Sequence, residues 1–215
     1  MDSLTQFTLG AAVGEAMLGR QLGRRAALWG GLLGTLPDLD VLIPLGDAVR
    51  DFTYHRGVSH SLFVLAALTP LIVWAIRRLN VDARALTWRI GLTVYLIFAT
   101  HVLLDSFTVY GTQIFWPVVL TPMTWSTIFI IDPAYTLPLA FGVLSAVIVR
   151  HHPFGHRANL VGLGLSTLYL AWTVGAKLHV HEIAKTSLAG QGIEVRQLLS
   201  TPPIFASCAL LAEVL

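Results

Sequence analysis

Residues 89–105 read RIGLTVYLIFATHVLLD, an apolar run that ends in a histidine and an aspartate. Such a run is long enough for most of a membrane-spanning helix, which needs about 20 residues. His101 and Asp105 are four residues apart, so on a helix their side chains lie on the same face. Ionisable side chains are costly inside a membrane and therefore indicate function. The stretch predicts a helical membrane protein with a polar site.

The composition of the whole chain agrees with a membrane protein. Its 215 residues are 55% hydrophobic and 12% charged, with a mean hydropathy of +0.70, whereas soluble domains carry about 25% charged residues. The net charge of +2 and the lack of basic runs exclude a typical nucleic-acid-binding protein. The single cysteine, Cys208, excludes an internal disulfide and a cysteine-based zinc cluster. The start lacks the basic region of a cleaved signal peptide, so we expect the hydrophobic segments to be uncleaved anchors.

Six apolar segments predict an all-α fold, a polytopic transmembrane helical bundle with about five to six membrane segments. They cover residues 6–19, 26–46, 61–79, 88–110, 128–149 and 158–176. The first is short and rich in glycine and alanine, so we expect it to be re-entrant or tucked between other helices. The second contains Pro37 and two aspartates, which predicts a broken or interfacial end.

Arginines predict the orientation of the chain. Three connections between segments hold nine of the fourteen Lys and Arg residues: Arg20, Arg24, Arg25, Arg77, Arg78, Arg84, Arg89, Arg150 and Arg157. The positive-inside rule places these connections in the cytoplasm. The clustered acids and histidines then lie at the opposite ends of the segments. We therefore expect a multi-pass membrane protein whose site faces the extracytoplasmic side.

A change in polarity divides the chain into two parts. Residues 1–176 form the predicted membrane-embedded domain, and the more polar residues 177–215 form a predicted extracytoplasmic helix and tail. Thr201-Pro202-Pro203 predicts a turn. The apolar stretch that follows is too short to span a membrane, so we expect it to be the start of a truncated region or a divergent end.

The candidate metal ligands form three clusters. Asp38 and Asp40 follow Pro37, which prevents a normal helical hydrogen bond and lets the carboxylates turn toward a cavity. Two neighbouring carboxylates repel each other unless a cation or a shared proton lies between them. Aspartate and histidine are ligands for zinc and other divalent metals. The predicted ligands are Asp40, His60, His101 and Asp105, followed by Asp38 and His55.

Each cluster also has a plainer interpretation. His101 and Asp105 would form a hydrogen-bonded pair between helices. Asp38 would be a solvated helix cap. His55 and His60 would be interfacial histidines in a loop.

Two further residues are candidates for catalysis. Asp132, between an apolar run and a proline, would be a further ligand, a general base or a helix cap. Arg56 would bind a phosphate or carboxylate group, or else contact a lipid headgroup or Asp51. Asp38 is the alternative general base if it does not bind the metal. The sequence contains no zinc-protease, nucleophile-elbow or phosphate-loop motif.

At these residues the chain resembles the membrane-bound metal-dependent hydrolase family, the YdjM-like inner-membrane proteins. The matching motifs are Met1-Asp2-Ser3-Leu4-Thr5-Gln6, Leu9-Gly10-Ala11-Ala12, Gly34-Thr35-Leu36-Pro37-Asp38-Leu39-Asp40, His55-Arg56-Gly57-Val58-Ser59-His60-Ser61 and His101-Val102-Leu103-Leu104-Asp105. The family is distantly similar to zinc-dependent phospholipase C and P1-type nucleases.

The resemblance implies that residues 1–176 are a hydrolase domain that uses a divalent metal, zinc. The expected substrate is a phosphate ester or lipid-linked phosphate at the outer interface, and the expected partners are membrane lipids. Many relatives carry a histidine where this chain has Gln6, and an amide is a poor zinc ligand. The chain would then hold fewer metals. A non-catalytic scaffold or regulatory protein and a metal-ion transporter are the alternatives.

Overall fold

The computed structural model describes residues 1–42, 46–47, 55–79, 85–149 and 152–191, and the backbone of 198–199 and 213–214. Its helices are α1 (Ser3–Leu22), α2 (Arg24–Thr35), η1 (Pro37–Leu42), η2 (Val58–His60), α4 (Leu62–Leu79), α5 (Thr87–Ser106), α6 (Pro133–Ile148) and α7 (Pro153–Gly190). The two-residue strands β1 (Leu198–Leu199) and β2 (Glu213–Val214) pair antiparallel. The predicted all-α architecture is confirmed.

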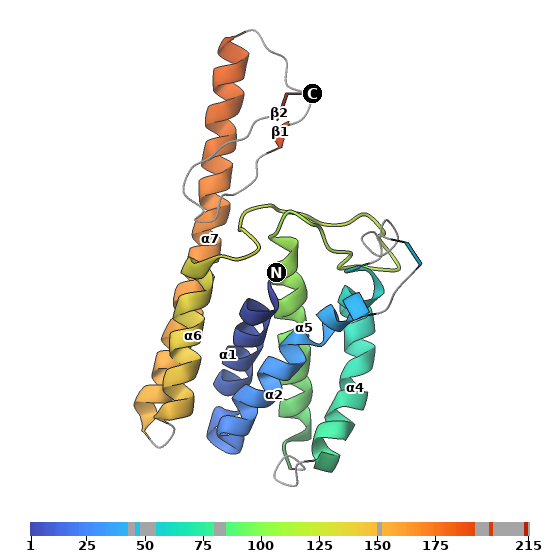
Figure 1. Cartoon of the computed structure of the whole chain (residues 1–215), viewed down its shortest axis with the longest axis vertical. Coiled ribbons are helices and arrows are strands. Elements are labelled where there is room, and N and C mark those ends of the chain that lie inside the picture. The colour runs from blue at the N-terminus through green and yellow to red at the C-terminus, as the bar shows by residue number, and fades with distance from the viewer. Residues whose placement is uncertain are drawn as a thin grey trace.

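The helices alternate in direction (Figure 1). Three connections therefore lie at the same end of the bundle: those between α1 and α2, between α4 and α5, and between α6 and α7. The short helices η1 and η2 lie at the other end. This separates the arginine-rich helix ends from the clustered acids and histidines, as the sequence predicts.

Three helices in the described part of the chain are long and apolar enough to cross a membrane: α4, α5 and α7. This is fewer than the predicted five to six. The helices α2 and α6 have 12 and 16 residues, fewer than a simple span requires. The predicted break at Pro37 is confirmed, because α2 ends at Thr35 and η1 begins at Pro37.

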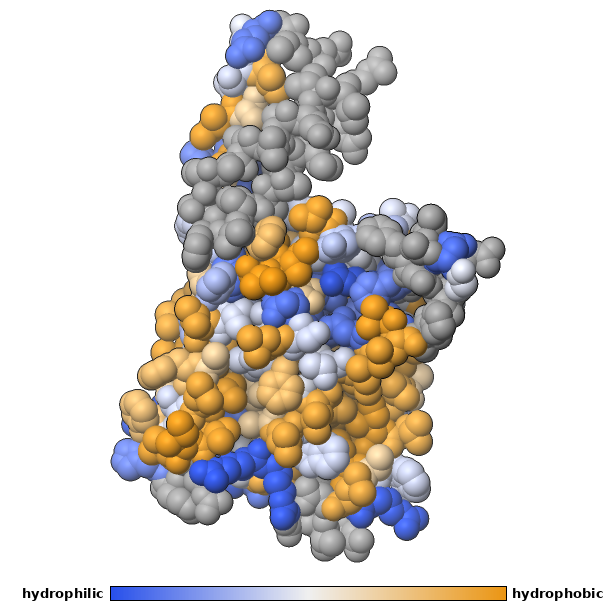
Figure 2. Space-filling model, in the orientation of Figure 1, coloured by the Kyte–Doolittle hydropathy of each residue, from blue (hydrophilic) through white to orange (hydrophobic). Residues whose placement is uncertain are grey.

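Helix α7 runs unbroken from Pro153 to Gly190, through the boundary predicted at residue 176, and its last turns project beyond the other helices (Figure 1). The predicted turn at residues 201–203 lies outside the described residues. Apolar side chains cover most of the visible surface of the bundle, with hydrophilic residues gathered near both ends (Figure 2). Such a distribution suits a protein surrounded by lipid.

Helices α1 and α2 pack backbone against backbone. A β-carbon at Gly30 would lie 2.2 Å from the carbonyl oxygen of Gly10, and one at Gly34 would lie 2.5 Å from the carbonyl oxygen of Gln6. Gly10 and Gly14 on α1, and Gly30 and Gly34 on α2, are each four residues apart. This is the small-residue spacing that permits close helix contact in membranes. The first segment is thus tucked between other helices, one of the two predicted arrangements.

We predict that Gly30→Ala destabilises the protein by about 1–3 kcal/mol, because the new methyl group has no space between two backbones. The matched control is Gly164→Ala, since a β-carbon at Gly164 on α7 meets nothing within 4 Å. Thermal unfolding in detergent would measure both variants. Equal melting temperatures for the two would contradict the close contact.

Candidate metal centre

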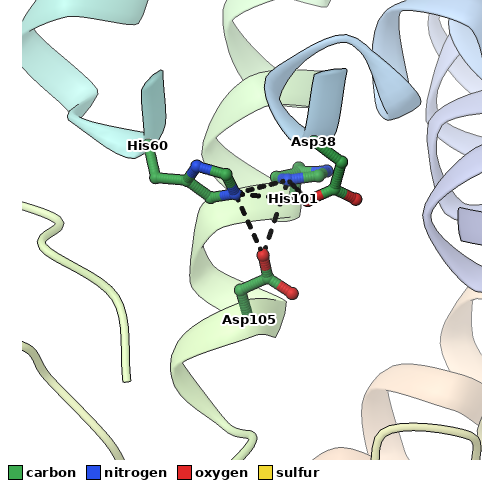
Figure 3. A group of neighbouring side chains, drawn as sticks. All are labelled: Asp38, His60, His101 and Asp105. Carbon is green, nitrogen blue, oxygen red and sulfur yellow. Dashed lines mark hydrogen bonds and ion pairs between the residues drawn. The ribbon is translucent and has the colours of Figure 1, made fainter. Parts of the chain in front are cut away.

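Four side chains from three elements meet near one end of the bundle. Asp38 comes from η1, His60 from η2, and His101 and Asp105 from α5. Each offers one ligand atom, and these atoms all lie within 4.8 Å of one another. Figure 3 shows the two imidazole rings and the two carboxylates facing a common point. The group could therefore hold a metal ion.

Five of the six spacings between these atoms are close to those around a tetrahedral ion. His60 Nε2 lies 3.2 Å from Asp105 Oδ2 and 3.4 Å from Asp38 Oδ1. His101 Nε2 lies 3.6 and 3.5 Å from the same two oxygens, and 3.2 Å from His60 Nε2. Zinc bonds of about 2.0–2.1 Å in a tetrahedron separate the ligand atoms by about 3.3–3.4 Å.

A hydrogen bond at Nδ1 of His101 fixes Nε2 as the nitrogen that faces the other three side chains. His101 Nδ1 lies 2.7 Å from the carbonyl oxygen of Gly34. A carbonyl only accepts hydrogen bonds, so Nδ1 carries the proton and Nε2 of the neutral ring keeps its lone pair. Asp105 Oδ2, the oxygen that faces both histidines, is buried without a hydrogen-bond partner. Buried carboxylate oxygens need compensation, which a cation in this group would supply.

Asp38 and His60 are the two members of the group that lie outside α5, and each shifts the pKa of the other. Burial by itself raises the pKa of the Asp38 carboxyl, but hydrogen bonds with His101 and His60 hold that pKa below its usual range. Burial lowers the pKa of His60, and the carboxylates of Asp105 and Asp38 outweigh burial and raise it. Both directions follow from the closeness of carboxylates and imidazoles in a buried site.

Asp105 presents different oxygens to two sets of partners. Its Oδ1 accepts hydrogen bonds from the amino group of Met1 and, at 3.0 Å, from Gln6 Nε2. Arg56 Nη2 lies 3.5 Å from the same oxygen. Its Oδ2 faces the two histidines. The structure thus brings Gln6 to the edge of the centre, with its Oε1 buried and unpartnered.

Asp40 and His55 lie behind His60, outside the four-residue group. Asp40 accepts hydrogen bonds from the Ser59 hydroxyl and, at 3.2 Å, from the Arg56 amide, and its Oδ1 lies 2.8 Å from His55 Nδ1. Ser59 Oγ lies 2.9 Å from His60 Nδ1. Asp40 and Ser59 therefore orient His60 through its second nitrogen, the usual task of residues surrounding metal ligands. The sequence analysis placed Asp40 ahead of Asp38 as a predicted metal ligand. The structure brings Asp38, and not Asp40, into the four-residue group.

Arg56 lies beside the centre in a turn that favours glycine. Its φ is 64°, and its side chain is buried. Nη1 donates to Thr108 Oγ1 at 3.2 Å, the guanidinium lies over the Tyr110 ring, and Nε has no hydrogen-bond partner. A residue held in an uncommon conformation with an unused donor suits a functional role.

Asp132 is not part of the four-residue group. It caps α6, since its Oδ1 accepts from the Ala134 amide at 2.9 Å, and its Oδ2 accepts from the Tyr169 hydroxyl at 2.8 Å. Of the three predicted roles, the structure shows the cap. His179 and His181 lie on the projecting part of α7, away from the centre.

Sequence analysis missed an ionisable cluster at the other end of the bundle. Glu15 on α1 is buried and lies 3.1 Å from His156 Nδ1 on α7. Asn159 Nδ2 donates to Glu15 Oε2 at 2.6 Å and to the Ala12 carbonyl at 2.9 Å. None of these three residues was among the predicted site residues. The signal was Glu15 itself, the only acid in the apolar segment 6–19.

A family model described as YdjM inner membrane protein matches residues 1–180. The chain belongs to the YdjM inner membrane protein family. No curated protein and no solved structure matches it. Membership of the YdjM family, with the apolar helices α4, α5 and α7, identifies a membrane protein and confirms that part of the predicted resemblance. The similarity to zinc-dependent phospholipase C stays a prediction.

We predict that purified protein binds about one zinc ion per chain, and that His60→Ala, His101→Ala or Asp105→Asn weakens binding by at least about 100-fold. Metal analysis after dialysis against zinc would measure this, and gel filtration would verify folding. The matched control is His179→Ala, an exposed histidine on α7.

The variant Asp40→Asn tests whether Asp40 binds the metal directly or only orients His60. We expect it to weaken zinc binding by about 10–100-fold, less than Asp105→Asn, because Asp40 acts through Ser59 and His60. A loss as severe as that of Asp105→Asn would make Asp40 a direct ligand. Zinc retention by all of the ligand variants would contradict the centre.

Proposed function

We propose that this protein is a zinc-dependent hydrolase that acts on a phosphate ester or a lipid-linked phosphate. The observation that carries the proposal is the group Asp38, His60, His101 and Asp105 with a buried arginine beside it. Carboxylate and imidazole ligands at tetrahedral spacing suit zinc. The adjacent guanidinium suits an anionic substrate.

The four residues differ in how firmly they are held. His60, His101 and Asp105 are fully buried, and His101 and Asp105 lie on the same face of α5. Asp38 is 15% exposed and lies on the short helix η1. Catalytic zinc sites use three protein ligands and keep a fourth position for water or substrate. His60, His101 and Asp105 would therefore hold the metal, leaving Asp38 as the general base.

Zinc in such a site polarises a phosphoryl oxygen and lowers the pKa of a bound water. The protein supplies the remaining functions. Asp38 would accept the proton of the attacking water. Arg56 would hold the phosphoryl anion with its unpartnered Nε and the outer edge of its guanidinium. Thr108 and the Tyr110 ring fix the position of that guanidinium.

The location of the centre suggests where the substrate comes from. The positive-inside rule assigns the arginine-rich helix ends to the cytoplasm, which puts the centre on the extracytoplasmic side of the inner membrane. The segment after α5 exposes large apolar side chains: Val109, Tyr110, Phe115, Val118, Val119, Leu120 and Trp125. Apolar side chains beside a polar site are suited to a lipid-linked phosphate that arrives laterally from the membrane.

Two other functions are compatible with a bound metal. A non-catalytic scaffold or regulatory protein would use the metal only for stability. A metal-ion transporter would need a polar route from the centre to Glu15 at the opposite end. Buried apolar side chains such as Val94, Ile97 and Phe98 occupy the middle of the bundle, which favours hydrolysis over transport.

Turnover assays test the proposal. We expect zinc-loaded protein to release product from bis-p-nitrophenyl phosphate, p-nitrophenyl phosphate or phosphatidic acid in mixed micelles, and Asp105→Asn to abolish release. Zinc binding without turnover of any of the three would favour the scaffold. Zinc flux into liposomes, lost in the same variant, would favour the transporter.

Arg56 offers a second, independent prediction. Arg56→Gly relieves the positive φ while it removes the cation, so we expect normal folding and zinc content with kcat/KM lowered by about 10–100-fold. Arg56→Lys keeps the charge and should restore part of the loss. Unchanged kcat/KM in Arg56→Gly would assign Arg56 a structural role.

A further inference from the structure

A pocket lies at the end of the bundle opposite the metal centre, where α1 meets α2 and α6 meets α7. Its volume is about 230 Å³. Three guanidinium groups line it, those of Arg20 on α1, Arg24 on α2 and Arg157 on α7, together with His152 and His156. Glu15 is the only carboxylate among the described lining residues.

The hydrogen-bond partners of the Glu15 carboxylate are His156 and Asn159. One oxygen lies 3.1 Å from His156 Nδ1, and the other accepts from Asn159 Nδ2 at 2.6 Å. Glu15 thus links α1 to α7, and its single negative charge offsets only one of the three arginines. Arg24 Nε donates to the Val147 carbonyl at 2.7 Å, which holds that guanidinium at the pocket. The pocket therefore carries a net positive charge in its ordinary state.

The chemistry of the lining selects a phosphate group. Guanidinium groups present parallel N–H donors that match phosphate oxygens in pairs. Helix α7 begins beside the pocket at Pro153, and the partial positive charge of a helix start adds to the same preference. The cavity is larger than a phosphate group, so it admits a substituted one.

Exposed apolar residues lie on the helices that form the pocket. Leu28, Ile148 and Phe154 are exposed large hydrophobic residues adjacent in sequence to residues that line it. A cationic pocket with exposed apolar residues on the same helices, at a membrane face, suits a headgroup whose acyl chains lie along the helices.

We propose that this pocket binds the phosphate group of an anionic ligand, such as the headgroup of an anionic phospholipid. The site is separate from the metal centre and does not depend on the hydrolase proposal. Binding there would tie the α1–α2 end to the α6–α7 end through Arg20 and Arg157. The ligand would thereby stabilise the folded bundle.

The test compares two double variants. Arg20→Gln with Arg157→Gln removes two exposed guanidinium groups from the pocket. The matched control, Arg78→Gln with Arg89→Gln, removes two exposed arginines from the same end of the bundle that lie over Trp74 and Trp88. Thermal unfolding and native mass spectrometry in detergent would be measured with added phosphatidylglycerol, phosphatidylcholine or inorganic phosphate.

We expect phosphatidylglycerol to raise the melting temperature of the wild type and the control, and its affinity for the pocket variant to fall by about tenfold or more. Stabilisation by phosphatidylglycerol but not by inorganic phosphate supports the site with a lipid as its ligand. Equal stabilisation by inorganic phosphate supports the site with a soluble ligand. An equal loss in both double variants, or no stabilisation of the wild type by either phosphate compound, overturns the proposal.

Discussion

Backbone contact between α1 and α2 is the constraint on which the metal centre depends. Because Gly10 and Gly30 have no side chains, the two helices approach until a β-carbon at either glycine would meet the carbonyl oxygen of the other. This contact positions the carbonyl oxygen of Gly34 beside His101 Nδ1. It also positions the side-chain amide of Gln6 beside Asp105 Oδ1. Helix α2 then ends where η1 can place Asp38 against both histidines.

The centre places charge where an apolar bundle ordinarily excludes it. Removing a carboxylate from water is costly unless the protein returns its hydrogen bonds or supplies a cation. Asp105 receives this compensation at only one of its oxygens. Its Oδ1 accepts hydrogen bonds from the Met1 amino group and from Gln6, whereas its Oδ2 has no hydrogen-bond partner. The unengaged oxygen and two imidazole nitrogens face one point, which is the physical case for a metal ion there.

The two polar ends of the bundle differ in the sign of the charge they attract. At one end, carboxylates and imidazoles face one point and attract a cation; at the other, three arginines line a pocket with a carboxylate that is already hydrogen-bonded. Helix α1 reaches both environments, through Gln6 at the centre and Glu15 at the pocket, and the apolar core of the bundle buries Phe98 and Ile97 of α5. The same arginines that orient a chain in a membrane thus also form a pocket suited to an anionic group.

Much of this arrangement was determined by the sequence itself. The apolar segments predicted the six α-helices of the described residues, arginine placement predicted which helix ends lie together, and the four-residue spacing predicted that His101 and Asp105 share a face. The number of spans was overestimated, because the apolar segments 26–46 and 128–149 give helices of only 12 and 16 residues.

Only the tertiary structure decided between Asp38 and Asp40. A 3₁₀-helix has about three residues per turn, so side chains two positions apart point in different directions. Helix η1 directs Asp38 into the centre and leaves Asp40 behind His60. The contact of Glu15 with His156 was likewise invisible in the sequence, because it joins residues 141 positions apart that only the packing of α1 against α7 brings together.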